Sequence, residues 1–386
     1  MSNAVPLSAQ TGAFQTPALR RITLRVREVG GINLAQGVCN LAPPPGLFEA
    51  ASRAMEAGHN RYTDPRGLAS LRRALAEKAH SEQGLQYDPD QNVFATQGAT
   101  GAFEAVCGVL LNPGDKVALF EPTYPYHTQA LRRLGAEILR MPLLAPDWSV
   151  DWDMVRGTLA QKPKFILVNT PGNPTGKVWT TEELDQLAAL LDGTDTLVIT
   201  DEIYEHMVFD GRRHVSPATR PGLRDKTITI SGFSKTFAIT GWRIGSLMAP
   251  SWMSGALTSY LDAVYVCPPA PLQQACAEAI GFLGSPFFES LSPKYQAKRD
   301  FFADALTQQG FTVTMPQGAY YMLVGYEGVL GPIHPDEAAD QLIDRCGVGA
   351  VPASDFVQNP ESAHWLRFCL VSEDNVLQDA LARLAQ

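Results

Sequence analysis

Lys235 and Arg243 are the residues of this chain whose types and setting point most directly to chemistry. Lys235 lies among small residues in the segment 231–236, directly after an apolar run at residues 227–230, and Arg243 follows in the segment 240–245. An amine at such a strand end suits Schiff-base formation with an aldehyde cofactor. The nearby arginine would hold the phosphate of that cofactor.

Asp201 ends a second apolar run, at residues 196–200, and Tyr204 follows it closely. A carboxylate at a buried strand end needs a cationic partner, because an unpaired buried charge is costly. A protonated pyridine nitrogen would be such a partner, and Tyr204 could hydrogen-bond the phenolic oxygen of the same ring. In isolation, the pair fits an N-cap aspartate and a core tyrosine better.

Two segments rich in small residues also follow expected strands. Residues 96–102 precede an apolar helix, where backbone N–H groups and the Thr100 hydroxyl could approach an anion, although for this segment alone a simple tight turn is the favoured explanation. Residues 169–176 form an irregular loop of prolines and glycines, in which the Asn173 amide can face a ligand. A plain turn explains this second segment less well.

Arg367 is a charge inside the strand-like apolar run 364–369. A buried arginine typically pairs with a carboxylate through two hydrogen bonds, and either the protein or a substrate can supply this carboxylate. For one arginine taken alone, an internal salt bridge is the usual explanation.

Short apolar runs alternate with helix-like segments through the middle of the chain, which predicts a parallel sheet covered on both faces. A helix is expected at residues 181–191, since Glu182 and Glu183 would lie in its favoured first turn. In such sheets, ligands bind at the carboxyl ends of the strands, where the residues above are found. The expected buried strands are residues 116–120, 165–168, 196–200 and 227–230.

The pattern changes near residue 272 to longer helices and then a strand at residues 318–324, which indicates a second, α+β domain. The expected organisation is an N-terminal arm with part of the small domain (1–45), a large cofactor-binding domain (46–275) and a small C-terminal domain (276–386).

Composition and charge narrow the class of protein. The chain has 386 residues, of which 45% are hydrophobic and 18% charged, as in ordinary globular enzymes. The net charge of −9 argues against nucleic-acid partners and membrane surfaces, and neither a membrane span nor a secretory signal is expected. The six cysteines include no CxxC pair, so a cytoplasmic protein with free thiols is expected. No zinc-ligand spacing occurs, so no metal site is predicted.

Together, these segments resemble the class I aminotransferases, which are pyridoxal 5′-phosphate enzymes of fold type I. The resemblance runs from about Leu34 to the C-terminus, and its most specific parts are residues 173–176, residues 201–204, and Ser234-Lys235 with Arg243. It implies an α/β fold with a large domain, whose mixed, mostly parallel sheet is flanked by helices, and a smaller α+β domain.

The resemblance also implies a role for each residue. Lys235 would form the Schiff base and then shuttle a proton, Asp201 would pair with the pyridine nitrogen, and Asn173 and Tyr204 would contact the phenolic oxygen. Tyr62 would reach the phosphate of the other subunit, which implies a homodimer. The remaining assignments are Gly98, Ala99, Thr100, Ser234 and Arg243 for the phosphate, Tyr124 for stacking on the ring, and Gly37, Asn173 and Arg367 for the substrate.

The chain departs from the family pattern at two places. Gly232 stands where many members have a serine, so one phosphate hydroxyl would be absent or come from Ser231. Asp262 stands where dicarboxylate-selective relatives have an arginine that binds the distal carboxylate from across the dimer. Since a carboxylate repels an acidic side chain, the donor is expected not to be strictly dicarboxylic. Asp262 could select a cationic side chain, or it could be a solvated charge at a helix end.

Several aromatic residues are compatible with an apolar or aromatic side-chain pocket, although at least half are expected in the core. This set resembles the branch that includes kynurenine, glutamine and methionine aminotransferases. Its members are Phe14, Tyr62, Tyr124, Tyr320 and Tyr321.

The expected function is ping-pong transfer of an amino group between an L-amino acid and a 2-oxo acid. A carbon–sulfur β-lyase or an aspartate aminotransferase-type enzyme would use the same residues and is the alternative. A ligand-sensing domain of a transcription regulator is disfavoured, since it would add a helix-turn-helix domain and a basic surface.

Overall fold

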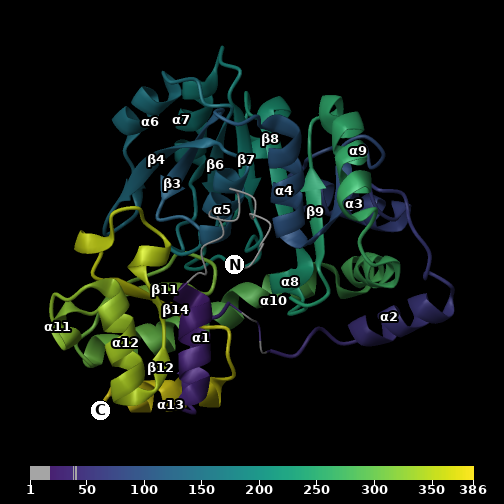
Figure 1. Ribbon diagram of the computed structural model, residues 1–386. Coiled ribbons are helices and arrows are strands. Elements are labelled where there is room, and N and C mark those ends of the chain that lie inside the picture. Colours follow the sequence, from purple (N-terminus) through teal and green to yellow (C-terminus); the bar gives the residue numbers. More distant parts are fainter. Residues whose placement is uncertain (1–17, 38, 40) are drawn as a thin grey trace, which may run out of the picture.

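An eight-stranded mixed sheet is the centre of the computed structural model, which describes residues 18–386 apart from residues 38 and 40 (Figure 1). Neighbouring strands from β8 through to β4 are parallel, whereas β9 is antiparallel to both β8 and β2, and β5 is antiparallel to β4. In spatial order the strands are β2 (Val93–Gln97), β9 (Ile244–Met248), β8 (Thr227–Gly232), β7 (Leu197–Asp201), β6 (Phe165–Asn169), β3 (Lys116–Glu121), β4 (Glu137–Leu144) and β5 (Ser149–Val150).

The four predicted buried strands are confirmed as β3, β6, β7 and β8. Side chains alternate between the two faces of a strand, so Ile199 joins one apolar cluster and Val198 joins another. Both faces of the sheet are therefore apolar and covered by helices, which explains why these strands are nearly continuous apolar runs.

Helices cover each face of this sheet. One face packs on α4 (Gly98–Leu110), α5 (Pro125–Arg133) and α9 (Ser254–Tyr265). The opposite face packs on α6 (Trp152–Leu159) and α7 (Thr181–Leu191), and near β2 on α2 (Leu47–Glu56), α3 (Ala69–Gln83) and α10 (Ala270–Gln308). Short 3₁₀ turns are η2 (Pro217–Thr219), η3 (Arg224–Lys226) and η4 (Ser251–Met253).

The helix predicted at residues 181–191 has these bounds in the structure, and a reciprocal cap explains its start. The Thr180 hydroxyl accepts from the Glu183 backbone N–H at 3.2 Å, while the Glu183 carboxylate accepts from the Thr180 N–H at 2.9 Å. Two otherwise unpaired N–H groups are satisfied in this way.

A second, antiparallel sheet near the C-terminus has the order β10-β11-β14-β13. The strand predicted to start at Gly318 starts at Tyr321, because Ala319 has φ +61° and cannot continue an extended strand. The elements are β10 (Thr312–Thr314), β11 (Tyr321–Gly325), α11 (Glu327–Leu330), α12 (Pro335–Cys346), β12 (Val348–Gly349), β13 (Val351–Pro352), η5 (Ala353–Asp355), η6 (Pro360–Ser362), β14 (Trp365–Cys369) and α13 (Asp374–Leu384).

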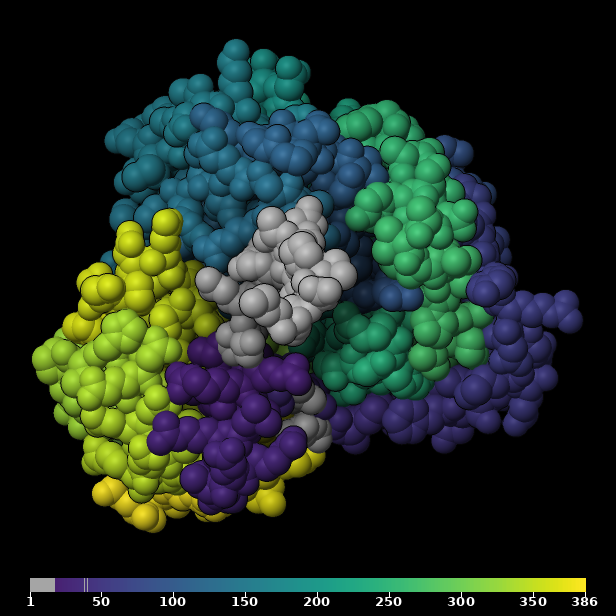
Figure 2. All heavy atoms as spheres, viewed as in Figure 1, coloured from purple at the N-terminus to yellow at the C-terminus, as the bar shows by residue number. Residues whose placement is uncertain are grey.

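The first described helix, α1 (Ala18–Glu28), packs on this C-terminal part of the chain (Figures 1 and 2). Its Ile22 and Val26 are buried in the same apolar cluster as Leu342 of α12 and Leu381 of α13. Next to it, β1 (Ile32–Asn33) pairs in parallel with β12.

Charged side chains add to this contact, because Arg25 of α1 lies 2.5 Å from Asp344 and 3.0 Å from Asp340 on α12. The helix α10 crosses the expected boundary at residues 275/276 and is interrupted at Gly284 (φ 58°, ψ −174°). The predicted domain boundaries therefore stay predictions. In the described part of the chain, no helix combines the length and apolar character needed to cross a bilayer.

Candidate active site

A cavity of about 320 Å³ lies where β3, β6, β7 and β8 end and where α1 and β14 approach them. Eleven of the predicted site residues line it: Gly37, Ala99, Thr100, Tyr124, Asn173, Asp201, Tyr204, Ser234, Lys235, Arg243 and Arg367. The structure therefore brings together side chains that are more than 300 positions apart in the sequence.

Lys235 lies on the short helix α8 (Phe233–Thr236) that follows β8, and its amine donates a 2.8 Å hydrogen bond to the Gly37 carbonyl oxygen. The Tyr320 hydroxyl donates to the same oxygen at 3.2 Å. Burial lowers the pKa of Lys235 to about 8. Near neutral pH, a larger share of this amine than of an exposed lysine is thus unprotonated and nucleophilic.

Asp201, at the carboxyl end of β7, is 7% exposed and paired on the cavity side of the sheet. Its Oδ2 lies 3.1 Å from Nε2 of His127 on α5, and its Oδ1 accepts from the Ile203 N–H at 3.2 Å. The sequence interpretation missed His127. Its place three positions after Tyr124, in the first turn of a helix, was the available signal.

Arg367 is 3% exposed, yet none of the described carboxylates forms an ion pair with it. Its Nη1 donates to Asn173 Oδ1 at 2.9 Å and its Nη2 to the Ala35 carbonyl at 2.6 Å. Its Nε has no hydrogen-bond partner among the described residues. The guanidinium lies 4.1 Å from the ring centroid of Tyr321, which lines the cavity. Of the two explanations for this arginine, the structure favours an anionic ligand over an internal salt bridge.

Arg243 precedes β9 with φ +58° and donates to the Thr240 carbonyl at 3.1 Å. Within the described ranges it, too, forms no ion pair. Because β9 is antiparallel to β2, with Ile244 opposite Gln97, Arg243 is delivered to the N-terminus of α4. Ala99 and Thr100 lie in the first turn of that helix, whose free N–H groups favour an anion.

Gly98 lies next to Arg243 and does not line the cavity itself. It has φ +68°, and a Cβ there would lie 2.4 Å from Nη2 of Arg243. Only glycine allows the guanidinium to approach the helix so closely.

Tyr204 follows Asp201 on a turn, and its hydroxyl donates to the Tyr321 hydroxyl at 3.1 Å. Burial raises the pKa of Tyr204 well above its usual value, so the phenol stays protonated and can donate to a ligand. Tyr124 stacks with Tyr126 at the cavity wall, with ring centroids 5.2 Å apart. Tyr320 and Tyr321 are buried at 1% and 3% exposure, as expected for core members of the aromatic set.

The suggestion that Ser231 supplies a phosphate hydroxyl is wrong. Ile230 faces α4 and α9, so Ser231 must point to the opposite face of β8. Its hydroxyl donates there to Glu205 at 3.1 Å. A side chain at Gly232 would also collide, since a Cβ there would lie 2.8 Å from the Gly245 Cα.

Other predicted residues lie away from the cavity of their own chain. Tyr62 is 85% exposed on the loop between α2 and α3, and Asp262 is exposed on α9. Their roles across a dimer stay predictions. Phe14 lies outside the described residues.

Residues 29–384 match the sequence model of aminotransferase class I and II. The chain belongs to this family. It is 31% identical over 360 residues to a methionine aminotransferase of Escherichia coli, covering 92% of both chains. It is 32% identical over 379 residues to kynurenine–oxoglutarate transaminase 3 of Rattus norvegicus, covering 90% of this chain and 83% of that one.

The fold agrees with this assignment. The structure of N-succinyldiaminopimelate aminotransferase from Mycobacterium tuberculosis superposes with a TM-score of 0.94 at 32% identity, covering 98% of this chain and 99% of that one. The protein is therefore an aminotransferase with the type I fold, which confirms the predicted fold class, enzyme class and branch. These relatives are named for three chemically different amino donors.

Proposed function

We propose that this aminotransferase binds pyridoxal 5′-phosphate and moves an amino group between a neutral L-amino acid and a 2-oxo acid by ping-pong chemistry. One observation carries the proposal: the amine of Lys235 lies in a cavity with two arginines, Arg243 and Arg367, that have no anionic partner among the described residues. A phosphate and an amino-acid carboxylate are the two anions that this arrangement fits.

The cavity fits the cofactor in two respects. Arg243, Thr100 and the N-terminus of α4 form a cradle for a phosphate that a Cβ at Gly98 would obstruct. Asp201 offers a buried carboxylate to a cationic ring nitrogen. When bound, the cofactor supplies an aldehyde for Schiff-base formation and a ring that withdraws electrons from the substrate.

Each polar side chain then has a defined role. The Lys235 amine would be the nucleophile toward the aldehyde and would also move the proton at the substrate α-carbon. His127 holds the Asp201 carboxylate, which would pair with the ring nitrogen, and the Tyr204 hydroxyl, which donates to Tyr321 here, would turn to donate to the phenolic oxygen. Asn173 Oδ1 accepts from Arg367, so its Nδ2 remains to donate to a ligand. Arg367, with the backbone at Gly37, receives the α-carboxylate.

The proposed preference for neutral side chains follows from the cations that this chain offers. Among the described residues that line the cavity, the lysines and arginines are Lys235, Arg243 and Arg367. Residues 1–17, 38 and 40 contain no lysine or arginine. The phosphate and the α-carboxylate occupy the two arginines. No third cation of this chain is therefore left for a distal carboxylate, whereas Leu19, Tyr126 and Tyr321 offer apolar surface.

The proposal includes a homodimer in which Tyr62 reaches the partner's site, while Asp262, exposed on α9, disfavours an acidic side chain. The 85% exposure of Tyr62 supports such a contact. A cytoplasmic location is supported by six free cysteines, four of them buried. The acidic charge supports small-molecule partners and not nucleic acid.

A spectral titration tests this function. Protein loaded with pyridoxal 5′-phosphate should show a visible Schiff-base band that Lys235→Ala lacks, and methionine, kynurenine or phenylalanine should convert that band to the aminated form. Faster conversion by aspartate or glutamate would contradict the proposed preference. Pyruvate and ammonia released from a cysteine conjugate, without an added 2-oxo acid, would identify a β-lyase instead.

A further inference from the structure

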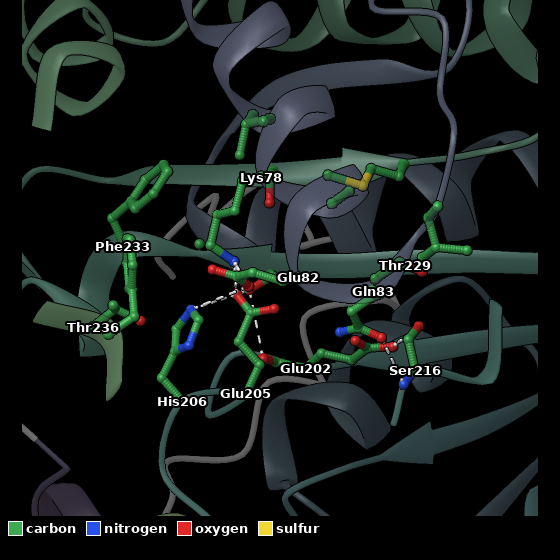
Figure 3. A pocket seen from close by; sticks show the side chains of 18 residues that line it. Lys78, Glu82, Gln83, Glu202, Glu205, His206, Ser216, Thr229, Phe233 and Thr236 are labelled. Carbon is green, nitrogen blue, oxygen red and sulfur yellow. Dashed lines mark hydrogen bonds and ion pairs between the residues drawn. The ribbon is translucent and has the colours of Figure 1, made fainter. Parts of the chain in front are cut away.

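A cluster of buried charges lies on the face of the sheet opposite the active-site cavity, around a second cavity of about 40 Å³ (Figure 3). We call it the rear cluster. It comprises Lys78 and Glu82 from α3, Glu202, Glu205 and His206 from the turn after β7, His214 and Ser216 from the following loop, and Ser231 from β8.

Glu205 joins three elements in this cluster. Its Oε1 accepts from Lys78 Nζ of α3 and from Ser231 Oγ of β8, each at 3.1 Å. The same lysine donates to Glu82 at 2.9 Å. The turn after β7 is therefore tied both to a helix and to the strand that leads into Lys235.

Glu202 is 1% exposed and is held equally firmly. Its Oε1 accepts from Ser216 Oγ at 2.6 Å, and its Oε2 lies 2.7 Å from Nε2 of His214. Burial opposes the charge of His214, yet the attraction of Glu202 and Glu205 outweighs it and raises the pKa of this histidine. These contacts tie the start of the same turn to the loop at residues 214–216.

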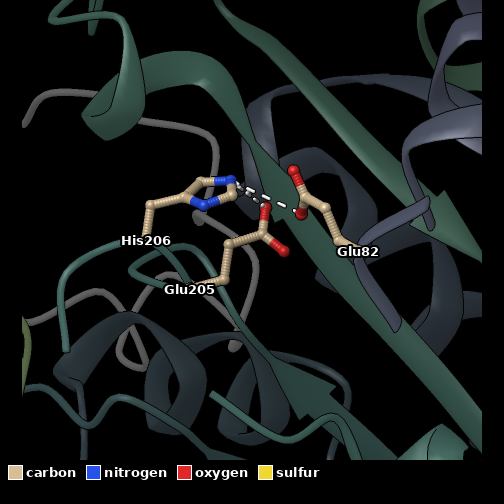
Figure 4. Close-up of side chains that lie close together, drawn as sticks. All are labelled: Glu82, Glu205 and His206. Carbon is tan, nitrogen blue, oxygen red and sulfur yellow. Dashed lines mark ion pairs between the residues drawn. The ribbon is translucent and has the colours of Figure 1, made fainter. Parts of the chain in front are cut away.

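The charges within the cluster identify Lys78 as its resident cation. Burial opposes its charge, but attraction to Glu205 and Glu82 leaves the pKa of Lys78 raised. Burial likewise opposes the Glu205 charge, but the attraction of Lys78, the strongest of the nearby charges, helps lower the pKa of Glu205 to about 2. Burial and Lys78 lower the pKa of His206 to about 3, so its contacts with Glu82 (3.8 Å) and Glu205 (3.6 Å) involve a neutral ring (Figure 4).

The position of Lys78 bears on an alternative explanation of the cluster, namely that it is a metal site. The ligand atoms of Glu82, Glu205 and His206 lie within 4.8 Å of one another, as metal ligands would. However, the Lys78 ammonium already lies about 3 Å from both carboxylates. The cluster is therefore better explained by an internal task than by a metal ion.

The turn itself indicates what that task is. Residues 201–206 are divided between the two cavities, since Asp201, Ile203 and Tyr204 line the active site while Glu202, Glu205 and His206 line the rear cavity. On the active-site side, Asp201 is held by His127, and Tyr204 by one hydrogen bond to Tyr321. Backbone pairing with β8 also holds the start of the turn, since Asp201 lies opposite Ile230 and the Glu202 N–H donates to the Ile230 carbonyl at 2.8 Å. The rear contacts of Glu205 add side-chain ties from the later part of the turn to β8 and α3.

We propose that Glu205 and Glu202 are positioning residues, which fix Asp201 and Tyr204 relative to Lys235 through the rear cluster. This inference rests on the proposed function. A displacement of about 1 Å at the reacting groups can lower a rate about 100-fold. The same displacement would change how well Asp201 and Tyr204 stabilise the charge of the bound cofactor.

The test compares four variants loaded with pyridoxal 5′-phosphate. Glu205→Met removes the tether and leaves Lys78 with Glu82 as its remaining carboxylate partner among the described residues, whereas Lys78→Met/Glu205→Met removes the tether together with this buried lysine. Ser231→Ala removes only the contact to β8. Lys298→Met is the matched control, because Lys298 is a buried lysine that pairs with Asp374 of α13 and does not line the rear cavity.

Three quantities are measured: the pH midpoint of the visible Schiff-base band, kcat and KM for one donor, and the Tm of the cofactor-free protein. A positioning role predicts that Glu205→Met and the double variant both shift the midpoint by about one pH unit and lower kcat at least about 10-fold. The double variant should regain part of the lost Tm, since it no longer buries a lysine that has lost one of its two carboxylate partners. Ser231→Ala should shift the midpoint with little change in Tm, while Lys298→Met should lower Tm alone.

A wild-type midpoint and kcat in the double variant would overturn the proposal and leave a purely structural role. If Glu205→Met fails to fold, the double variant and Ser231→Ala still decide. If the wild-type protein forms no visible band with the cofactor, the proposed function fails, and not the positioning role alone.

Discussion

The setting of a single amine, that of Lys235, determines much of the chemistry. Burial lowers its pKa from 10.5 to about 8. A lowered pKa means that the amine loses its proton at a lower pH than an exposed lysine does, and only the unprotonated amine attacks an aldehyde. The Gly37 carbonyl holds the amine toward the cavity in the meantime.

We therefore expect cofactor-free protein to take up pyridoxal 5′-phosphate at a rate that rises with pH and levels off above about pH 8. Stopped-flow absorbance between pH 6 and 10 measures it, with Lys235→Ala as the blank. A rate still rising steeply at pH 10 would show that the lysine keeps its ordinary pKa.

Among single residues, those predictable from the sequence were charged residues that need a partner of opposite charge when they are buried. Lys235, Asp201 and Arg367 are charges at the ends or in the middle of apolar runs, and the cavity contains all three. His127 was missed because its partner, Asp201, is far away in sequence. Ser231 was placed wrongly because one step along a strand reverses the face to which a side chain points.

Among the elements, the junction of β2, α4 and β9 depends on backbone shape. We expect Gly98→Ala to weaken cofactor binding at least about 10-fold, since the added Cβ lies 2.4 Å from the Arg243 guanidinium and must displace it. Equilibrium dialysis of the cofactor measures this effect.

Gly193→Ala provides the matched control. Gly193 has φ +67°, close to the +68° of Gly98, but nothing lies within 4 Å of its added Cβ. Both variants carry the same backbone strain, which lowers Tm. Equal cofactor affinity in the two variants would show that the contact with Arg243 does not matter.

Strands were predictable where apolar runs were continuous, as in β6 and β7, because burial on both faces leaves no polar positions. β4 was not predicted, since Arg140 and Pro142 interrupt its pattern. The antiparallel direction of β9 was not predictable either. It depends on pairing with β2, which is about 150 residues earlier in the chain, and it brings Arg243 to Gly98.

For the whole molecule, the proposed dimer predicts complementation between two inactive chains. Lys235→Ala lacks the nucleophile, and Tyr62→Ala lacks the side chain that would reach the partner's phosphate. In a mixed dimer, one site combines Lys235 of the second chain with Tyr62 of the first and is complete.

We expect co-expressed, differently tagged chains to give purified mixed dimers with about half of the wild-type turnover, one of two sites being intact. Each homodimer of a single variant serves as the control. A mixed dimer no more active than the Tyr62→Ala homodimer would show that Tyr62 acts within its own chain or not at all.

The packing of α1 against α12 also has a consequence for the chain while it is being synthesised. The ribosome makes Arg21 315 residues before Asp336, its contact on α12. At about 5–20 residues per second, this delay is roughly 15–60 s. Throughout that time Ile22 and Val26 have no apolar surface of the C-terminal domain to cover them. We therefore expect a chaperone to bind the N-terminal helix of the nascent chain, until α12 and α13 have been synthesised and take the place of the chaperone.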